Sequence, residues 1–131
     1  MAEHAPLPDS VNVVGRAIYD AAFEVHRHLG PGLLESVYKI CLAEELVRRG
    51  YSVRFEVAVP VVYKETKLGA GFRIDMLVNE VVVIEIKAVD VIYPVFESQL
   101  LTYLKLGGFR LGYLINFNVP LAKDGIRRYV N

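Results

Sequence analysis

Three charged residues stand in a part of the chain that is otherwise almost entirely apolar. Asp75 lies in the segment FRIDMLV, and ten residues later Glu85 and Lys87 lie in VVVIEIKAV. Alternate residues of a β-strand point to the same face, so Glu85 and Lys87 share a face if this segment is a strand. A carboxylate is costly to bury without a partner, and a glutamate at this position therefore needs one.

A tight hairpin turn at Asn79 and Glu80 would place Asp75 opposite, or nearly opposite, Glu85. Paired residues of antiparallel strands have Cβ atoms about 4.5–5.5 Å apart. Two carboxylates at this separation suit Mg²⁺, which typically takes one or two carboxylates and keeps several waters. Lys87 would then lie beside the metal-bound water, where it can orient the water or stabilise charge on a phosphate. The alternative is a cross-strand salt bridge near the end of a sheet.

Glu35 is the candidate for a third carboxylate. It shares a helix face with Tyr38, three residues later. If Glu35 converges on the same end of the sheet as Asp75 and Glu85, a cation site is favoured. The alternative is that Glu35, as an acid in the first turn of a helix, only complements the helix dipole. Tyr38 is expected in the core, with its hydroxyl bonded near the site.

Two further charged residues have two interpretations each. Arg73, two positions before Asp75, either holds a phosphate or neutralises the carboxylates. Glu56, in the first expected strand, either extends the acidic cluster or faces solvent. Both residues are candidates for a supporting role around the site.

Hydrophobic periodicity predicts the elements that must position these residues. Helices are expected at 10–29, with Ser10 as N-cap, at 33–49, with Leu34 on its buried face, and at 95–106. Strands are expected at 52–63, 71–78, 81–88 and 111–117, with a short last strand at 125–130 and a loop at 64–71. The third strand is apolar at nearly every position and should be central and covered on both faces. This order predicts an α/β fold with a mixed sheet flanked by helices.

Length and composition indicate one domain. The chain has 131 residues, 53% of them hydrophobic, with 15 basic and 15 acidic residues and a single cysteine, Cys41. We expect a flexible tail at 1–9 and one domain at 10–131. A lone cysteine excludes an internal disulfide and fits a reducing compartment, so a cytoplasmic location is expected. Apolar stretches fall far short of the roughly 18 residues that a membrane span needs.

The sequence resembles the GxxExxY proteins, a prokaryotic group within the PD-(D/E)XK nuclease-like superfamily. The resemblance covers residues 14–130 and rests on Gly32, Glu35 and Tyr38, on the Asp75 and Glu85-x-Lys87 segments, and on later signatures, which are Gln99 in QLLTYLKL and Asn116-Phe117 in LINF. It implies a restriction-endonuclease-like αβββαβ core preceded by an extra N-terminal helix.

The resemblance also implies roles for individual residues. Asp75 and Glu85 would be ligands of Mg²⁺ or Mn²⁺, and Lys87 the catalytic lysine. Glu35 would assist from its helix, and Gln99 would reach in from the following helix. Phe96 departs from the pattern, because a histidine is expected shortly before the glutamine.

Two functions follow as hypotheses. The first is a Mg²⁺-dependent nuclease in which a metal-activated water attacks a phosphodiester of DNA or RNA. The second is a catalytically degenerate module that binds nucleic acid or a protein partner, which the neutral charge, the small size and Phe96 favour. Zero net charge offers little general attraction to phosphate, so binding by the isolated chain should be weak, or helped by a partner or a homodimer.

Overall fold

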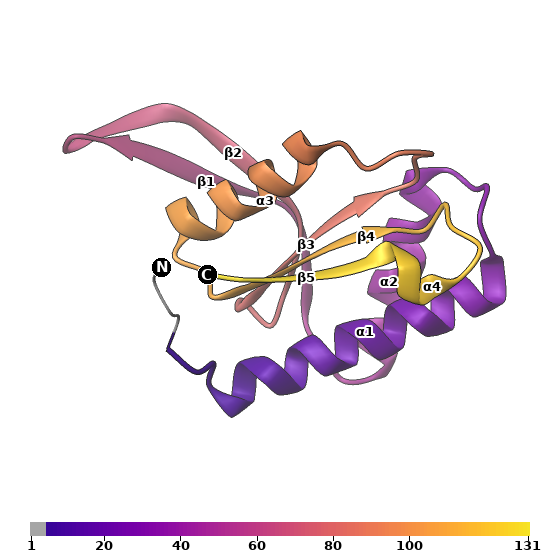
Figure 1. Ribbon diagram of the computed structural model, residues 1–131. Coiled ribbons are helices and arrows are strands. Elements are labelled where there is room, and N and C mark those ends of the chain that lie inside the picture. Colours follow the sequence, from indigo (N-terminus) through magenta and orange to yellow (C-terminus); the bar gives the residue numbers. More distant parts are fainter. Residues whose placement is uncertain (1–4) are drawn as a thin grey trace.

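The computed structural model describes residues 5–131 as a five-stranded sheet with helices on both faces (Figure 1). The elements are α1 (Asp9–Leu29), α2 (Glu35–Arg48), β1 (Val53–Tyr63), β2 (Thr66–Val78), β3 (Val82–Lys87), α3 (Pro94–Gly107), β4 (Leu111–Asn116), α4 (Ala122–Gly125) and β5 (Ile126–Val130). Within the described range, no helix is both long and apolar enough to cross a membrane.

The sheet is mixed, as predicted, and its strands lie in the order of the chain. β3 and β4 pair in parallel, and the other neighbouring strands pair antiparallel. β3 is central, and its residues from Val82 to Ile86 are buried. The expected α/β class with a restriction-endonuclease-like arrangement is confirmed, with α1 as the extra N-terminal helix.

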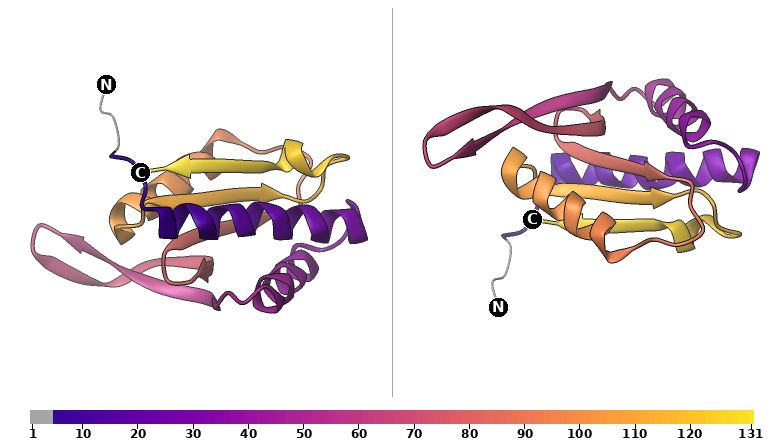
Figure 2. Two further views of the ribbon diagram at one scale, coloured as in Figure 1. Left: turned by 90° about the horizontal axis from the view of Figure 1, so that it is seen from below. Right: turned by 90° about the horizontal axis from the view of Figure 1, so that it is seen from above.

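Two apolar layers hold the helices to opposite faces of the sheet. On one face Ile18 of α1 and Leu42 of α2 belong to the same buried cluster as Ile84. On the other face Leu100 and Leu104 of α3 pack against a second cluster of sheet residues. Figure 2 shows α1 in front of the sheet in one view and α3 in front of it in the opposite view. The alternation of strand side chains allows β3 to contribute to both layers.

The expected loop at 64–71 is wrong. β1 and β2 remain paired as far as Val62 with Lys67 and Tyr63 with Thr66, so only Lys64 and Glu65 form the turn. Both turn residues have positive φ, 46° and 73°, as the tightest hairpin turns require. The glycines and lysines of this segment gave no strand signal, and pairing with β1 overrides the local preference.

Two details at the helix starts also differ from expectation. Ser10 is not the N-cap, because α1 begins at Asp9 and the carbonyl of Pro8 already accepts hydrogen bonds from the amides of Val11 and Asn12. Leu34 is exposed rather than buried, because α2 begins only after it. Ala5, in the expected tail, accepts a hydrogen bond from Arg110 at 2.6 Å, and residues 1–4 of that tail lie outside the described residues.

Tyr38 fixes the start of α2 relative to the sheet. Its side chain is fully buried, and its ring stacks on Phe117 with centroids 4.6 Å apart. The hydroxyl donates to the carbonyl of Gly30 at 2.6 Å and accepts from the amide of Leu33 at 3.1 Å. The predicted core position of Tyr38 is confirmed, and its hydroxyl holds the turn that precedes Glu35.

Replacing Tyr38 by phenylalanine should destabilise the protein by about 1–2 kcal/mol, because it removes two part-buried hydrogen bonds to the backbone, one to the Gly30 carbonyl and one from the Leu33 amide. Thermal unfolding measures the change. Tyr19→Phe is the matched control, since Tyr19 lies on α1 at the surface. Equal melting temperatures for the two variants would show that the Tyr38 hydroxyl contributes nothing to stability.

Candidate active site

Asp75 and Glu85 meet where the pairing of β2 with β3 ends. The ladder runs from Val78 opposite Val82 to Met76 opposite Ile84. Beyond it, side chains replace backbone partners: the amide of Ile86 donates to Asp75 Oδ2 at 3.2 Å, and the amide of Asp75 donates to Glu85 Oε1 at 3.4 Å. The hairpin turn therefore brings the two carboxylates together, as the sequence predicted.

Glu56 interrupts the pairing on the other side of Asp75. Its φ is +49°, and the β1–β2 ladder has no pair between Phe55 with Met76 and Val57 with Ile74. A non-glycine residue in this conformation is uncommon and costs energy. Its side chain forms an ion pair with Lys39 of α2. Asp75 thus lies where the regular ladders on both of its sides are broken.

Burial first, and then the negative charge of Asp75 and the hydrogen bond between the two carboxyl groups, together raise the pKa of Glu85 to about 8. The positive charge of Lys87 lowers the pKa of Glu85, but by less than these causes raise it. The side chain of Glu85 therefore holds a proton at neutral pH when no cation is bound. This is the behaviour of a buried carboxylate beside a like charge.

Lys87 makes no ion pair with Asp75, Glu85 or Glu35 closer than 4 Å within residues 5–131. Its ammonium lies instead 4.5 Å from the centre of the Phe96 ring, a cation–π contact. The described part of the chain therefore does not contain the cross-strand salt bridge that was the alternative explanation of these residues. The side chain of Lys87 is half-buried at the edge of the site.

Glu35 is exposed at the first residue of α2 and faces the same site. Its pKa is raised, first by partial burial and then by the charge of Asp75, while Lys87 and Lys39 act to lower it. These four charged residues are therefore close enough to influence one another. Across the described chain, however, no three acidic, histidine or cysteine side chains gather tightly enough to bind one ion.

Gln99 lies on α3 but does not reach the carboxylates. Its side-chain amide donates to the hydroxyl of Tyr103 at 2.6 Å. Tyr103 is closer to the site: burial raises its pKa, and the charges of Glu85 and Asp75 raise it further. The four-residue spacing of Gln99 and Tyr103 on a helix was the signal that could have identified this pair.

Arg73 is exposed and donates a 3.4 Å hydrogen bond to the carbonyl of Glu56. It forms no ion pair with Asp75 or Glu85 in the described part of the chain. Of the two interpretations, neutralisation of the carboxylates is therefore not what the structure contains.

Sequence reasoning missed the role of Lys39 and Asn116. Lys39 follows Glu35 by one helical turn and bonds Glu56, a spacing that could have been noticed. Asn116 pairs in register with Lys87, and its buried amide bonds both the amide and the carbonyl of Val89, at 3.1 Å and 2.9 Å. A polar residue ending a fully buried strand was the available signal. Asn116 fixes the connection that leads from Lys87 to α3.

The donor chemistry of this site fits a hard divalent cation. Asp75 and Glu85 supply carboxylate oxygens, the ligands that Mg²⁺ prefers, and two carboxylates with water complete its usual coordination. The raised pKa of Glu85 shows that the two neighbouring carboxyl groups lack a compensating positive charge, which a cation would supply. Asp75 and Glu85 are therefore the residues that would hold the ion, with Glu35 at the rim.

Binding of Mg²⁺ should displace the proton from Glu85 and should strengthen with pH. Because the pKa of Glu85 is about 8, affinity should rise by up to about tenfold per unit between pH 6 and pH 8. Calorimetry in buffers of different ionisation enthalpy measures the proton release directly. Glu85→Gln should abolish that release, and an affinity independent of pH would show that Glu85 is not a ligand.

Glu85→Gln should also stabilise the protein in the presence of EDTA at high pH. The folded-state pKa of Glu85, about 8, exceeds the ordinary value of 4.5. The contribution of this protonated side chain to the free energy of unfolding is therefore fully present below pH 4.5 and is lost as the pH rises through 8. The variant escapes this loss and should melt about 3 °C or more above the parent at pH 8.5. The difference should shrink toward pH 5. A constant difference across this range would exclude Glu85 as its cause.

Comparison with known proteins is consistent with this geometry. Neither the curated proteins nor the solved structures contain a significant match to the chain. The family model described as the PD-(D/E)XK nuclease superfamily matches residues 12–129, which include every residue of the site. The chain belongs to the PD-(D/E)XK nuclease superfamily.

Proposed function

We propose that this protein is a Mg²⁺-dependent nuclease of the GxxExxY group, hydrolysing phosphodiester bonds of DNA or RNA. Mn²⁺ should replace Mg²⁺, since both prefer oxygen ligands. The observation that carries the proposal is the hydrogen-bonded pairing of Asp75 with the buried Glu85, which makes no ion pair with any basic side chain of residues 5–131. Such a pair is costly in the free protein, and a divalent cation compensates it.

A bound divalent cation would supply Lewis acidity, which makes water a better nucleophile and neutralises charge on the phosphate. Asp75 and Glu85 would hold it at the end of the β2–β3 ladder. Lys87, on the same face as Glu85, donates hydrogen bonds to the phosphate oxygens, where negative charge accumulates during attack. Glu35 orients water at the rim, and Arg73 binds a neighbouring phosphate. Gln99 acts through Tyr103, holding that hydroxyl beside the carboxylates.

A second function, a non-catalytic module binding nucleic acid or a protein partner, is favoured by one observation. Lys87 lies over the ring of Phe96 at 4.5 Å instead of over the carboxylates. If this contact persists when substrate binds, the lysine is unable to act on phosphate. An activity assay separates the two functions.

Asp75→Asn and Lys87→Ala should each reduce cleavage of DNA or RNA by about a hundredfold or more, because each removes an interaction with the reacting charge. Single- and double-stranded substrates at low salt are incubated with Mg²⁺ or Mn²⁺ and resolved on denaturing gels. Asp20→Asn and Lys123→Ala are the matched controls, since both residues are exposed and lie outside the site.

Controls that cleave at the parent rate, together with inactive site variants of unchanged melting behaviour, support the nuclease. Equal trace cleavage by the parent and both site variants identifies contamination and favours the non-catalytic module. Calorimetry with Mg²⁺ on the same samples then separates loss of metal from loss of the lysine. Asp75→Asn should lose both cleavage and metal, whereas Lys87→Ala should lose only cleavage.

A further inference from the structure

The hairpin of β1 and β2 extends past the sheet as a two-stranded arm, here defined as residues 60–71 (Figure 1). Pairing of β2 with β3 begins only at Met76, so nothing in residues 5–131 pairs with the outer edges of the arm. An isolated two-stranded ribbon is marginally stable in water. The proposed site needs no such projection, which leaves the arm without an assigned role.

The tip of the arm combines aromatic and cationic side chains. Tyr63 has 62% of its surface exposed, and the ammonium of Lys64 lies 5.4 Å from its ring centre. Lys67, two residues after the turn, is also exposed. Exposed rings and ammonium groups bind bases and phosphates respectively.

Lys64, Lys67 and Arg73 carry positive charge that no acidic side chain compensates by an ion pair in the described residues. Many other basic residues do have such pairs, among them Arg27, Lys39, Arg48, Arg49, Arg54 and Arg127. Glu65 is the one acid within the arm's sequence. Although the net charge of the chain is zero, the β1–β2 hairpin therefore carries a strip of cations that are unpaired within residues 5–131, from Lys64 in the turn to Lys67 and Arg73 on β2.

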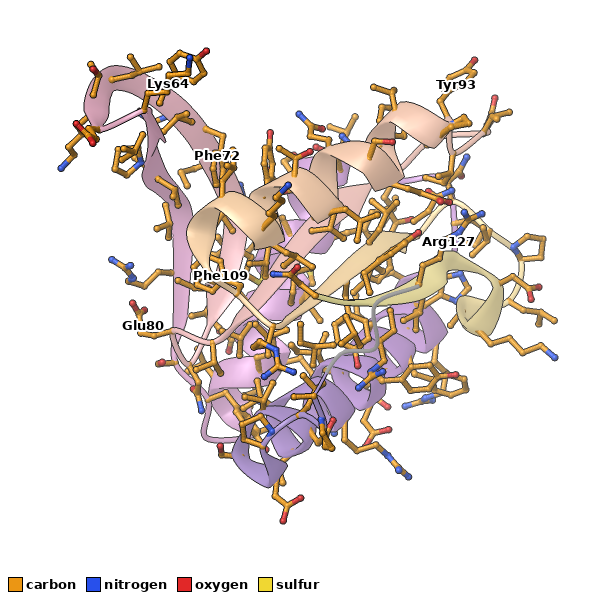
Figure 3. The ribbon with its side chains drawn as sticks, turned by 60° about the vertical axis from the view of Figure 1, so that its left-hand side comes forward. Lys64, Phe72, Glu80, Tyr93, Phe109 and Arg127 are labelled. Carbon is orange, nitrogen blue, oxygen red and sulfur yellow. The ribbon has the colours of Figure 1, made fainter. Side chains whose placement is uncertain are left out.

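This strip leads to the site. At the base of the arm the ring of Phe72 stacks on Tyr103 of α3, with centroids 4.2 Å apart and planes at 4°. Tyr103 is the residue whose pKa responds to Glu85 and Asp75. Figure 3 places Lys64 at the far end of the arm and Phe72 at its base beside α3. Asp75 lies eight positions after Lys67, about 26 Å along the strand, which matches seven to eight base pairs of duplex.

We propose that the arm binds duplex DNA, entering the major groove and guiding the backbone toward Asp75 and Glu85. This inference rests on the proposed nuclease function and names its substrate. The major groove of B-form DNA is about 12 Å wide and admits a two-stranded ribbon. The corresponding groove of duplex RNA is deep and narrow, and side chains do not read it. The arm therefore selects duplex DNA over duplex RNA.

Fluorescence anisotropy with the full chain in EDTA measures binding apart from cleavage. The probes are a labelled 20-base-pair DNA duplex, an RNA duplex of the same sequence and the single DNA strand, at several salt concentrations. Lys64→Glu and Lys67→Glu should each weaken DNA binding about fivefold or more and lower the salt slope by about one. Lys123→Glu, the same charge change on the short helix α4, should leave both nearly unchanged. Tyr63→Ala should weaken binding without altering the salt slope.

Equal loss for Lys67→Glu and Lys123→Glu would overturn the inference, as would RNA duplex or single-stranded DNA binding as tightly as DNA duplex. Size-exclusion chromatography of the parent and of Val62→Lys measures the oligomeric state. If the parent is a dimer and the variant is a monomer, the arm serves for contact between copies of the chain, and the inference is rejected. If the arm variants lose DNA binding while no cleavage occurs, the arm is supported and only catalysis fails. Cleavage of DNA that is unaffected by the arm variants retains the nuclease and rejects the arm.

Discussion

The site depends on one constraint: Glu85 must lie in the central strand and still have its carboxyl group satisfied. Its neighbours along β3 are apolar and buried, so water does not solvate the charge. The structure meets this constraint with Asp75, whose carboxylate accepts from the amide of Ile86 while its own amide donates to Glu85. In a regular antiparallel ladder these two amides would donate to carbonyl groups of the opposite strand. Here carboxylates accept in place of those carbonyls, which leaves the end of the hairpin open to a ligand.

Other elements hold this open end in place. The left-handed conformation of Glu56 interrupts the ladder on the far side of Asp75, and Lys39 anchors its carboxylate to α2. Tyr38 bonds the turn before α2 and stacks on Phe117, so the helix that carries Glu35 is tied to the end of β4. A strained backbone conformation persists when the surrounding packing holds it more strongly than the local conformational preference opposes it. Here the packing comes from both a helix and a neighbouring strand.

The charge distribution explains how a neutral protein can act on a polyanion. Three surface arginines, Arg27, Arg48 and Arg49, are bonded to glutamates about one helical turn away, and such exposed pairs contribute little to stability. These pairs do neutralise the arginine charges, which then no longer attract phosphate at long range. Cations without an acidic partner in the described residues include Lys64, Lys67 and Arg73 on the β1–β2 hairpin and Lys87 beside the carboxylates. Local rather than total charge therefore decides where phosphate is attracted, and net charge alone is a poor guide to the substrate.

The amino-acid sequence by itself determined the helices, the central strand and the opposition of Asp75 and Glu85, because hydrophobic period and one tight turn are local and fix the register of a hairpin. Other features required the tertiary structure. The arm formed where a loop was expected, since pairing with β1 overrode weak local preference. Lys87 lies over Phe96 of α3 instead of pairing with Glu85, because contacts between side chains on different elements are decided by packing after the chain has folded. Hydrophobic periodicity does not predict distances between side chains on different elements.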